Sequence, residues 1–203
     1  MNGGEGSQMP PRERITKAQI VDAAVALIRR EGEAALSARS LSGELRCSTQ
    51  PIFRCFSSME EVRGAVLDRI HREYLTFMTN YCAASSFPAY KASGMAYIAY
   101  AGAQPNCFRM LFMRGRRGDE SGPETADWEP TIRAVAAATG LSYEQAERFH
   151  LALWATVHGL AVMGATGYLT LPEQTVGEIL SDVYLGLREK TEALHRRDTD
   201  ECH

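Results

Sequence analysis

The chain has 203 residues, 45% of them apolar, which is enough to bury a core of ordinary size. No stretch approaches the roughly 18 consecutive apolar residues of a membrane span, so we expect no membrane partner. The net charge of −3 does not by itself favour a nucleic-acid partner. The first segment, MNGGEGSQMPP (residues 1–11), has neither the basic nor the apolar part of a signal peptide. We therefore expect a flexible tail on a cytoplasmic protein, with a second tail at residues 198–203.

Charge is unevenly distributed along the chain. Residues 12–58 carry eight basic and five acidic side chains, whereas residues 59–203 carry fourteen and nineteen. This asymmetry is typical of a two-part protein of which only the first part contacts phosphate. The five cysteines show no CxxC spacing, and we expect neither a metal site nor a cofactor.

The first part is predicted to form short helices. Thr16 and Gln19 have the spacing of a capping box and open a helix that Gly32 ends. Ser37 is predicted to cap a second helix and Ser48 a third.

The second and third helices are joined by only three or four residues, which is typical of a helix-turn-helix unit. Leu41, Leu45, Ile52 and Phe56 are predicted to hold the pair together. In such a unit the second helix enters the major groove of DNA and its amino-terminal residues meet the bases.

The rest of the chain is also helical in period, and no alternating strand pattern or hairpin signal appears. A second predicted capping box, Ser58 to Glu61, opens a long helix, and Arg114–Gly122 is predicted to be a loop. Further helices are predicted at residues 90–104, 105–113, 124–139, 142 to about 164 or 167, and from Pro172 onwards. The sequence therefore predicts an all-α fold of about nine helices, with a helix-turn-helix domain at residues 12–60 and a larger helical domain at 61–197.

The stretch SLSGELRCSTQPIFRCFSSMEEV (residues 40–62) resembles the amino-terminal DNA-binding domain of the TetR family of transcriptional repressors. ALWATVHGLAVM (152–163) and YIAYAGAQPNCFRMLFMR (97–114) further resemble one subgroup's carboxy-terminal domain, which has a Trp-His-Gly signature. The sequence departs from the family pattern at five positions. Arg46 stands where the family has Gly, Cys47 where it has Val, and Phe53 where it has Tyr. Cys55 stands where it has His or Tyr, and Met59 where it has Lys.

For DNA contact, we interpret Gln50 as a base-reading residue, since its amide can pair with adenine through two hydrogen bonds. A solvated residue at a helix start is the alternative. Serine hydroxyls and helix-start N–H groups can bind phosphate, and the same serines can serve only as caps. The predicted DNA-binding set is Lys17, Ser37, Arg39, Ser48, Thr49, Gln50, Pro51, Phe53, Arg54 and Ser58.

The middle helices are rich in aromatic residues and methionine, which line apolar ligand pockets and also fill ordinary cores. The predicted effector pocket contains Tyr74, Phe77, Met78, Tyr97, Tyr100, Phe112, Trp128, Trp154 and His158. His150 and His158 are eight residues apart, about 12 Å along a helix, so one metal ion cannot bridge them within a chain.

The resemblance implies that the last two helices pair with those of a second subunit. The predicted dimer interface contains Leu153, Val157, Val176, Ile179, Val183 and Leu187, and an intrachain core face is the alternative. Cys47 and Cys55 flank the third helix, where they can act as a redox switch or as small core residues.

The resemblance and these patterns together predict a homodimeric transcriptional regulator, most simply a repressor. It would read a palindromic double-stranded DNA operator and release it on binding a small, apolar or aromatic effector. The rival interpretation is an all-α small-molecule-binding protein or enzyme that uses the helix-turn-helix as a scaffold. No catalytic motif favours an enzyme.

Overall fold

The computed structural model describes residues 14–113 and 128–200, with side chains as far as residue 193, and these ranges are entirely helical. They contain nine α-helices and one 3-10 turn, Glu33–Ala35, which confirms the predicted all-α fold. The helices are α1 Lys17–Glu31, α2 Ala38–Glu44, α3 Gln50–Cys55, α4 Met59–Ala84, α5 Ala89–Ala103, α6 Pro105–Phe112, α7 Glu129–Thr139, α8 Tyr143–Thr166 and α9 Glu173–Asp200.

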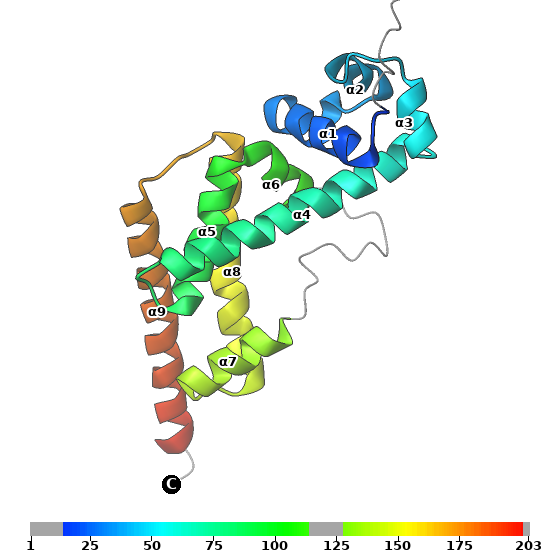
Figure 1. Ribbon diagram of the computed structural model, residues 1–203. Coiled ribbons are helices and arrows are strands. Elements are labelled where there is room, and N and C mark those ends of the chain that lie inside the picture. Colours follow the sequence, from blue (N-terminus) through cyan, green and yellow to red (C-terminus); the bar gives the residue numbers. More distant parts are fainter. Residues whose placement is uncertain (1–13, 114–127, 201–203) are drawn as a thin grey trace, which may run out of the picture.

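The helices form a small head and a larger body (Figure 1). Helices α1, α2 and α3 gather at one end of the molecule, and the long helix α4 runs from them into the body. Helices α8 and α9 run antiparallel in the body and are joined at the end near α6. Because α4 belongs to both parts, any change of its tilt moves the head relative to the body.

Local chemistry explains where most helices begin and end. At α1, the Thr16 hydroxyl accepts the Gln19 N–H while the Gln19 side chain accepts the Thr16 N–H, and the same reciprocal box opens α8 at Ser142. Gly140 and Gly167 end α7 and α8 with φ of 73° and 71°, a left-handed conformation that glycine adopts without a Cβ clash.

Two predicted caps differ from the structure. Ser48 does not cap the third helix, since α3 begins at Gln50 with Thr49 at its N-cap and no side-chain bond there. Pro51 lies in the first turn, so α3 already lacks one of the donors that a cap would satisfy.

At α4 only half of the predicted box forms. The Ser58 hydroxyl accepts the Glu61 N–H at 3.2 Å, but the Glu61 carboxylate accepts from Ser57 instead. The predicted loop Arg114–Gly122 and the first residues of the helix predicted at 124–139 lie outside the described residues.

Head and body share one apolar core. A continuous cluster of buried side chains includes Ile20 and Ile52 of the head together with Ile70 and Phe108 of the body. The Asn106 side chain also donates to the Arg29 carbonyl at 2.9 Å, which ties α6 to the end of α1. The head is therefore packed directly against the body as well as joined to it through α4.

Helix α8 is central to the body. It contacts α5, α6, α7 and α9, and a Cβ added at Gly94 of α5 would lie 3.1 Å from the Val157 side chain. Of the described helices, α8 is the one whose length and apolar composition would suffice to cross a membrane. Core helices can satisfy the same two measures, and α8 contacts four other helices of the body.

Candidate DNA-reading face and ligand cavity

Helix α3 has one buried and one exposed face. Ile52 is fully buried and Phe56 nearly so, whereas Phe53 is 48% exposed and Gln50 and Arg54 are exposed. The outward side chains line an open surface depression of about 420 Å³, formed by Ser48, Gln50, Pro51, Phe53 and Arg54. Five of the ten predicted DNA-binding residues thus lie together on a face that nothing else in the described chain covers.

The turn before α3 has an unusual backbone. Arg46 has φ of 50°, and it is the one non-glycine residue with positive φ among the described residues. A side chain in the left-handed region costs roughly 1–2 kcal/mol, which explains why the family pattern has Gly at this position. The Cys47 N–H closes the turn by donating to the Ser42 carbonyl at 3.0 Å.

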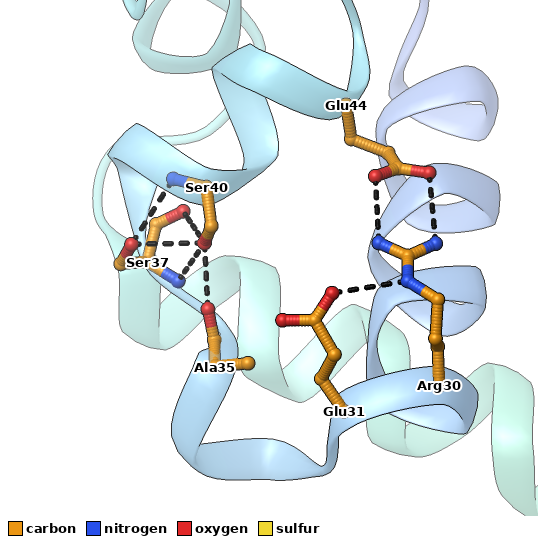
Figure 2. Close-up of polar contacts among 6 residues, drawn as sticks. All are labelled: Arg30, Glu31, Ala35, Ser37, Ser40 and Glu44. Atoms are coloured by element: carbon orange, nitrogen blue, oxygen red, sulfur yellow. Dashed lines mark hydrogen bonds and ion pairs between the residues drawn. The ribbon is translucent and has the colours of Figure 1, made fainter.

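Polar contacts hold α2 against α1 and against the segment that precedes α2 (Figure 2). Arg30 of α1 donates to both carboxylate oxygens of Glu44, at 3.3 and 2.9 Å, and to Glu31 at 3.0 Å. Hydrogen bonds from Arg30 lower the pKa of the Glu44 carboxyl. The Ser37 hydroxyl accepts the Ser40 N–H, and the Ser40 hydroxyl reaches the Ala35 carbonyl at 2.6 Å.

Basic side chains near α3 are free of carboxylate partners. Among the described residues, Arg39, Arg46 and Arg54 form no ion pair, and Arg54 donates only to the Ile15 carbonyl, at 3.4 Å. All three are exposed. Their charge is therefore available to an anion outside the protein.

Other basic residues in and beside the head are paired with carboxylates. Arg29 contacts Glu73 at 2.5 Å and Arg69 contacts Asp22 at 3.0 Å. Lys17, a predicted DNA contact, lies 3.1 Å from Glu61 and 4.8 Å from the centre of the Phe56 ring. Because surface ion pairs are weak, Lys17 can exchange Glu61 for another anion at small cost.

Glu61 lies at the amino-terminal end of α4. Its carboxylate accepts the Ser57 N–H at 2.6 Å and the Ser57 hydroxyl at 2.8 Å, and it pairs with Lys17. These bonds lower the pKa of Glu61 to about 2, with the Ser57 backbone contributing most. Ser37 and Ser58, predicted as phosphate ligands or caps, both act as caps here.

The predicted effector residues pack on one another. The Tyr74 ring centroid is 5.1 Å from those of both Tyr100 and Phe112, and Phe77 is 5.4 Å from Tyr100. Met78 packs against the same core cluster.

The series of ring contacts continues along α8. Trp154 stacks on His158 with centroids 4.9 Å apart, and Trp128 lies 5.3 Å from Trp154. The Tyr97 hydroxyl is 3.0 Å from His158 Nδ1.

The two histidines of α8 have separate tyrosine partners. The Tyr90 hydroxyl is 2.7 Å from His150 Nδ1, and burial lowers the pKa of His150. No group of three His, Cys, Asp or Glu side chains suited to a metal ion occurs in the part of the chain that the structure describes.

A cavity of about 190 Å³ lies on the other side of α5, and none of the predicted effector residues lines it. Met95, Ile98 and Gly102 of α5 face Leu160 and Gly164 of α8 across it. Tyr81 at the end of α4 and Glu173 at the start of α9 complete its lining, together with the connection between α8 and α9. Sequence reasoning missed this cavity because it favoured large aromatic residues, whereas glycines on facing helices help to leave the space.

Comparisons with known proteins agree with this geometry. Residues 90–183 match the family model described as tetracyclin repressor-like, C-terminal domain. An uncharacterized HTH-type transcriptional regulator of Mycobacterium tuberculosis (strain H37Rv) is 26% identical over 161 residues, which are 77% of this chain and 73% of the relative.

Solved structures share the fold. A TetR-like transcriptional regulator from Rhodococcus sp. RHA1 superposes with a TM-score of 0.63 at 14% identity, covering 88% of this chain and 97% of that one. A putative transcriptional regulator from Pseudomonas aeruginosa PAO1 gives 0.63 at 16% identity, covering 94% and 96%.

The second half of the chain is thus similar to the carboxy-terminal domain of TetR-like transcriptional regulators, and the whole chain shares their fold. As in the predicted TetR layout, α3 occupies the second position of the helix-turn-helix, with Thr49, Gln50 and Phe53 exposed upon it.

Of the six residues predicted for the dimer interface, two are buried within the single chain and four are half-buried. Leu153 and Val176 are 6% and 5% exposed. Val183 and Leu187 pack against the cluster that contains Leu153, and Val157 packs between clusters. Ile179 is half-buried on α9.

Proposed function

We propose that the protein is a homodimeric repressor that reads a palindromic operator with two copies of α3 and releases it when an effector binds the body. It acts in the cytoplasm and has no catalytic role. In each half-site, Gln50 contacts a base edge, Thr49 and Phe53 contact the sugar-phosphate backbone or a thymine methyl, and nearby arginines contact phosphates.

The observation that carries this proposal is the set of three exposed arginines without carboxylate partners in the described helix-turn-helix: Arg39 of α2, Arg46 of the turn and Arg54, which lines the open face of α3. The protein is acidic overall, so it attracts DNA only where its cations are not neutralised internally. A guanidinium can hold a phosphate by two hydrogen bonds, which offsets the missing tyrosine hydroxyl at Phe53 and the missing lysine at Met59.

For the dimer, α8 and α9 offer a different surface from the one predicted. Leu151 and Leu185 are 48% and 51% exposed, although both are large and apolar. Gly159 and Gly186 lie on the same helices with open space above them, which allows a partner helix to approach closely. We place the pairing surface on these four residues, with Ile179 at its edge.

The test is selection of bound sequences from random duplex DNA by the purified protein. The wild type should enrich a palindrome with half-sites about 34–36 Å apart, or a multiple of that distance. Gln50→Ala combined with Phe53→Ala should lose the enrichment.

Leu75→Ala is a matched control, because Leu75 is 49% exposed on α4 and Phe53 is 48% exposed on α3. It should select the same palindrome as the wild type. If a folded dimer enriches no sequence at all, the rival interpretation, a small-molecule-binding protein with a scaffold helix-turn-helix, replaces this proposal.

A further inference from the structure

The 190 Å³ cavity between α5, α8 and the start of α9 has an apolar interior and one charged group. Met95, Leu160 and Val176 supply apolar surface. Among the residues that line the cavity, Glu173 alone has a carboxyl group. The Tyr81 hydroxyl donates to the Glu173 carboxylate at 2.6 Å.

No basic side chain neutralises Glu173 in the described part of the chain. Glu173 is the first residue of α9, and the positive end of a helix favours a charged carboxylate. Burial and Glu173 raise the pKa of Tyr81 to about 12, so the phenol keeps its proton and remains the donor in this pair. An exposed carboxylate whose partner is a neutral phenol therefore lies at the edge of the cavity.

The size of the cavity limits the ligand. An apolar cavity of about 150 Å³ holds one benzene molecule, so 190 Å³ accommodates a single ring with a short substituent. The Tyr81 ring adds an aromatic face, and such faces attract ammonium groups.

We propose that this cavity is the effector site and that its ligand is a small aromatic cation, with the ring between α5 and α8 and the ammonium group beside Glu173 and Tyr81. The regulatory part of this inference rests on the proposed repressor function, and the binding part does not.

The position of Glu173 connects binding to the head. Tyr81 belongs to α4, which carries the head, and Glu173 belongs to α9, so their hydrogen bond joins the two helices directly. A cation beside Glu173 competes with the Tyr81 hydroxyl for the carboxylate. Loss of that bond changes how α4 is held against α9. The ligand shifts the equilibrium between the arrangement with the Tyr81–Glu173 bond and the one without it, and its difference in affinity for the two sets the size of that shift.

Binding is tested by calorimetry on the full chain with three probes of similar shape and different charge: benzyltrimethylammonium, benzyl alcohol and phenylacetate. The cation should bind more tightly than the alcohol, and phenylacetate should bind least. Glu173→Gln should lower the affinity for benzyltrimethylammonium roughly tenfold or more and leave the affinity for benzyl alcohol unchanged. Equal affinity for all three probes, or binding of none, would overturn the proposal.

The location is tested by filling the cavity. A Cβ added at Gly164 meets nothing within 4 Å, and Gly164 lines the cavity, so Gly164→Leu should fold and lose the cation. Gly64→Leu is the matched control, because Gly64 is also an open helical glycine and lies away from the cavity. Wild-type binding by Gly164→Leu would place the site elsewhere and overturn the assignment.

The regulatory part has a separate readout. On the selected operator, benzyltrimethylammonium should lower DNA affinity, and operator DNA should lower affinity for the cation by the same factor. If the cation binds and DNA affinity does not change, the cavity is a binding site without control over the head. If no operator exists, the calorimetry still decides the binding part while the repressor proposal fails.

Discussion

The head and the body differ in where their functional groups point and in how far apart along the chain their contacts lie. In the head, caps such as Ser37–Ser40 join residues three apart, and the exposed face of α3 points outwards. In the body, the bonds that matter join residues far apart in sequence, 61 between Tyr97 and His158 and 92 between Tyr81 and Glu173. The contrast implies that substitutions on the outward face of α3 change binding with little effect on stability, whereas substitutions in the packed aromatic core of the body lower stability.

The largest effect is expected from the body core. Phe108 is fully buried, with the ring centroids of Tyr97 and Phe112 5.3 and 5.0 Å away. Phe108→Ala should lower the free energy of unfolding by about 3–5 kcal/mol, because it leaves a cavity in a packed cluster. Phe53→Ala makes the same chemical change on the exposed face of α3 and should alter stability by less than about 0.5 kcal/mol. Urea unfolding at equal protein concentration measures both, and equal losses would contradict the contrast.

Within the head, Ile52 and Gln50 are two residues apart on α3 and should behave in opposite ways. Ile52→Ala should lower the free energy of unfolding by about 2–5 kcal/mol, since Ile52 is fully buried. Gln50→Ala should leave stability within about 0.5 kcal/mol of the wild type and still lose the preference for the operator over other DNA. Thermal unfolding together with a DNA-binding assay separates the two effects. A stability loss in both variants would mean that the α3 face is structural.

A smaller effect is expected at the caps. Ser37→Ala should cost about 1 kcal/mol, because the Ser37 hydroxyl accepts the Ser40 N–H at the start of α2. Ser48→Ala should cost less than about 0.5 kcal/mol, because Ser48 caps nothing. Chemical denaturation of the two variants compares a cap that forms with one that only the sequence suggests, and a larger loss at Ser48 would restore the original prediction.

The smallest effect concerns Glu61. Its pKa is lowered from 4.5 to about 2 in the folded protein. A carboxyl whose pKa is lower in the folded state stabilises the protein above pH 4.5, and this contribution disappears as pH falls towards 2. The wild type should therefore lose slightly more stability than Glu61→Gln between pH 4.5 and pH 2. Identical pH profiles would show that the bonds to Ser57 and Lys17 contribute nothing.

Features that depend on neighbours in sequence were predictable. The capping box at Thr16 and the helix end at Gly32 are encoded within a few residues, and both are confirmed. The exposed face of α3 follows from the burial of Ile52, which the helical period predicts. The prediction that Ser48 caps the third helix was wrong. Thr49, one residue later, also has a side chain that can cap a helix, and it occupies the N-cap position without forming a side-chain hydrogen bond.

Features that depend on packing between distant helices were not predictable. The rings assigned to an effector pocket contact one another across α4, α5, α6 and α8, and their role in ligand binding stays a prediction. The cavity lies where Gly102 and Gly164 face each other, a relationship that exists only after α5 and α8 have packed. The unpaired arginines likewise became visible only once the ion pairs of the head, such as Arg30 with Glu44, were known.

The most direct test of the account is the salt dependence of operator binding by the wild type, Arg39→Ala and Gln50→Ala. We predict a steep linear fall of log affinity with log salt for the wild type. Arg39→Ala should reduce the slope by roughly 1, and Gln50→Ala should keep the slope and lose the preference for the selected sequence. A wild type with a shallow slope, or an Arg39→Ala protein identical to it, would contradict the claim that the unpaired arginines around α3 hold DNA.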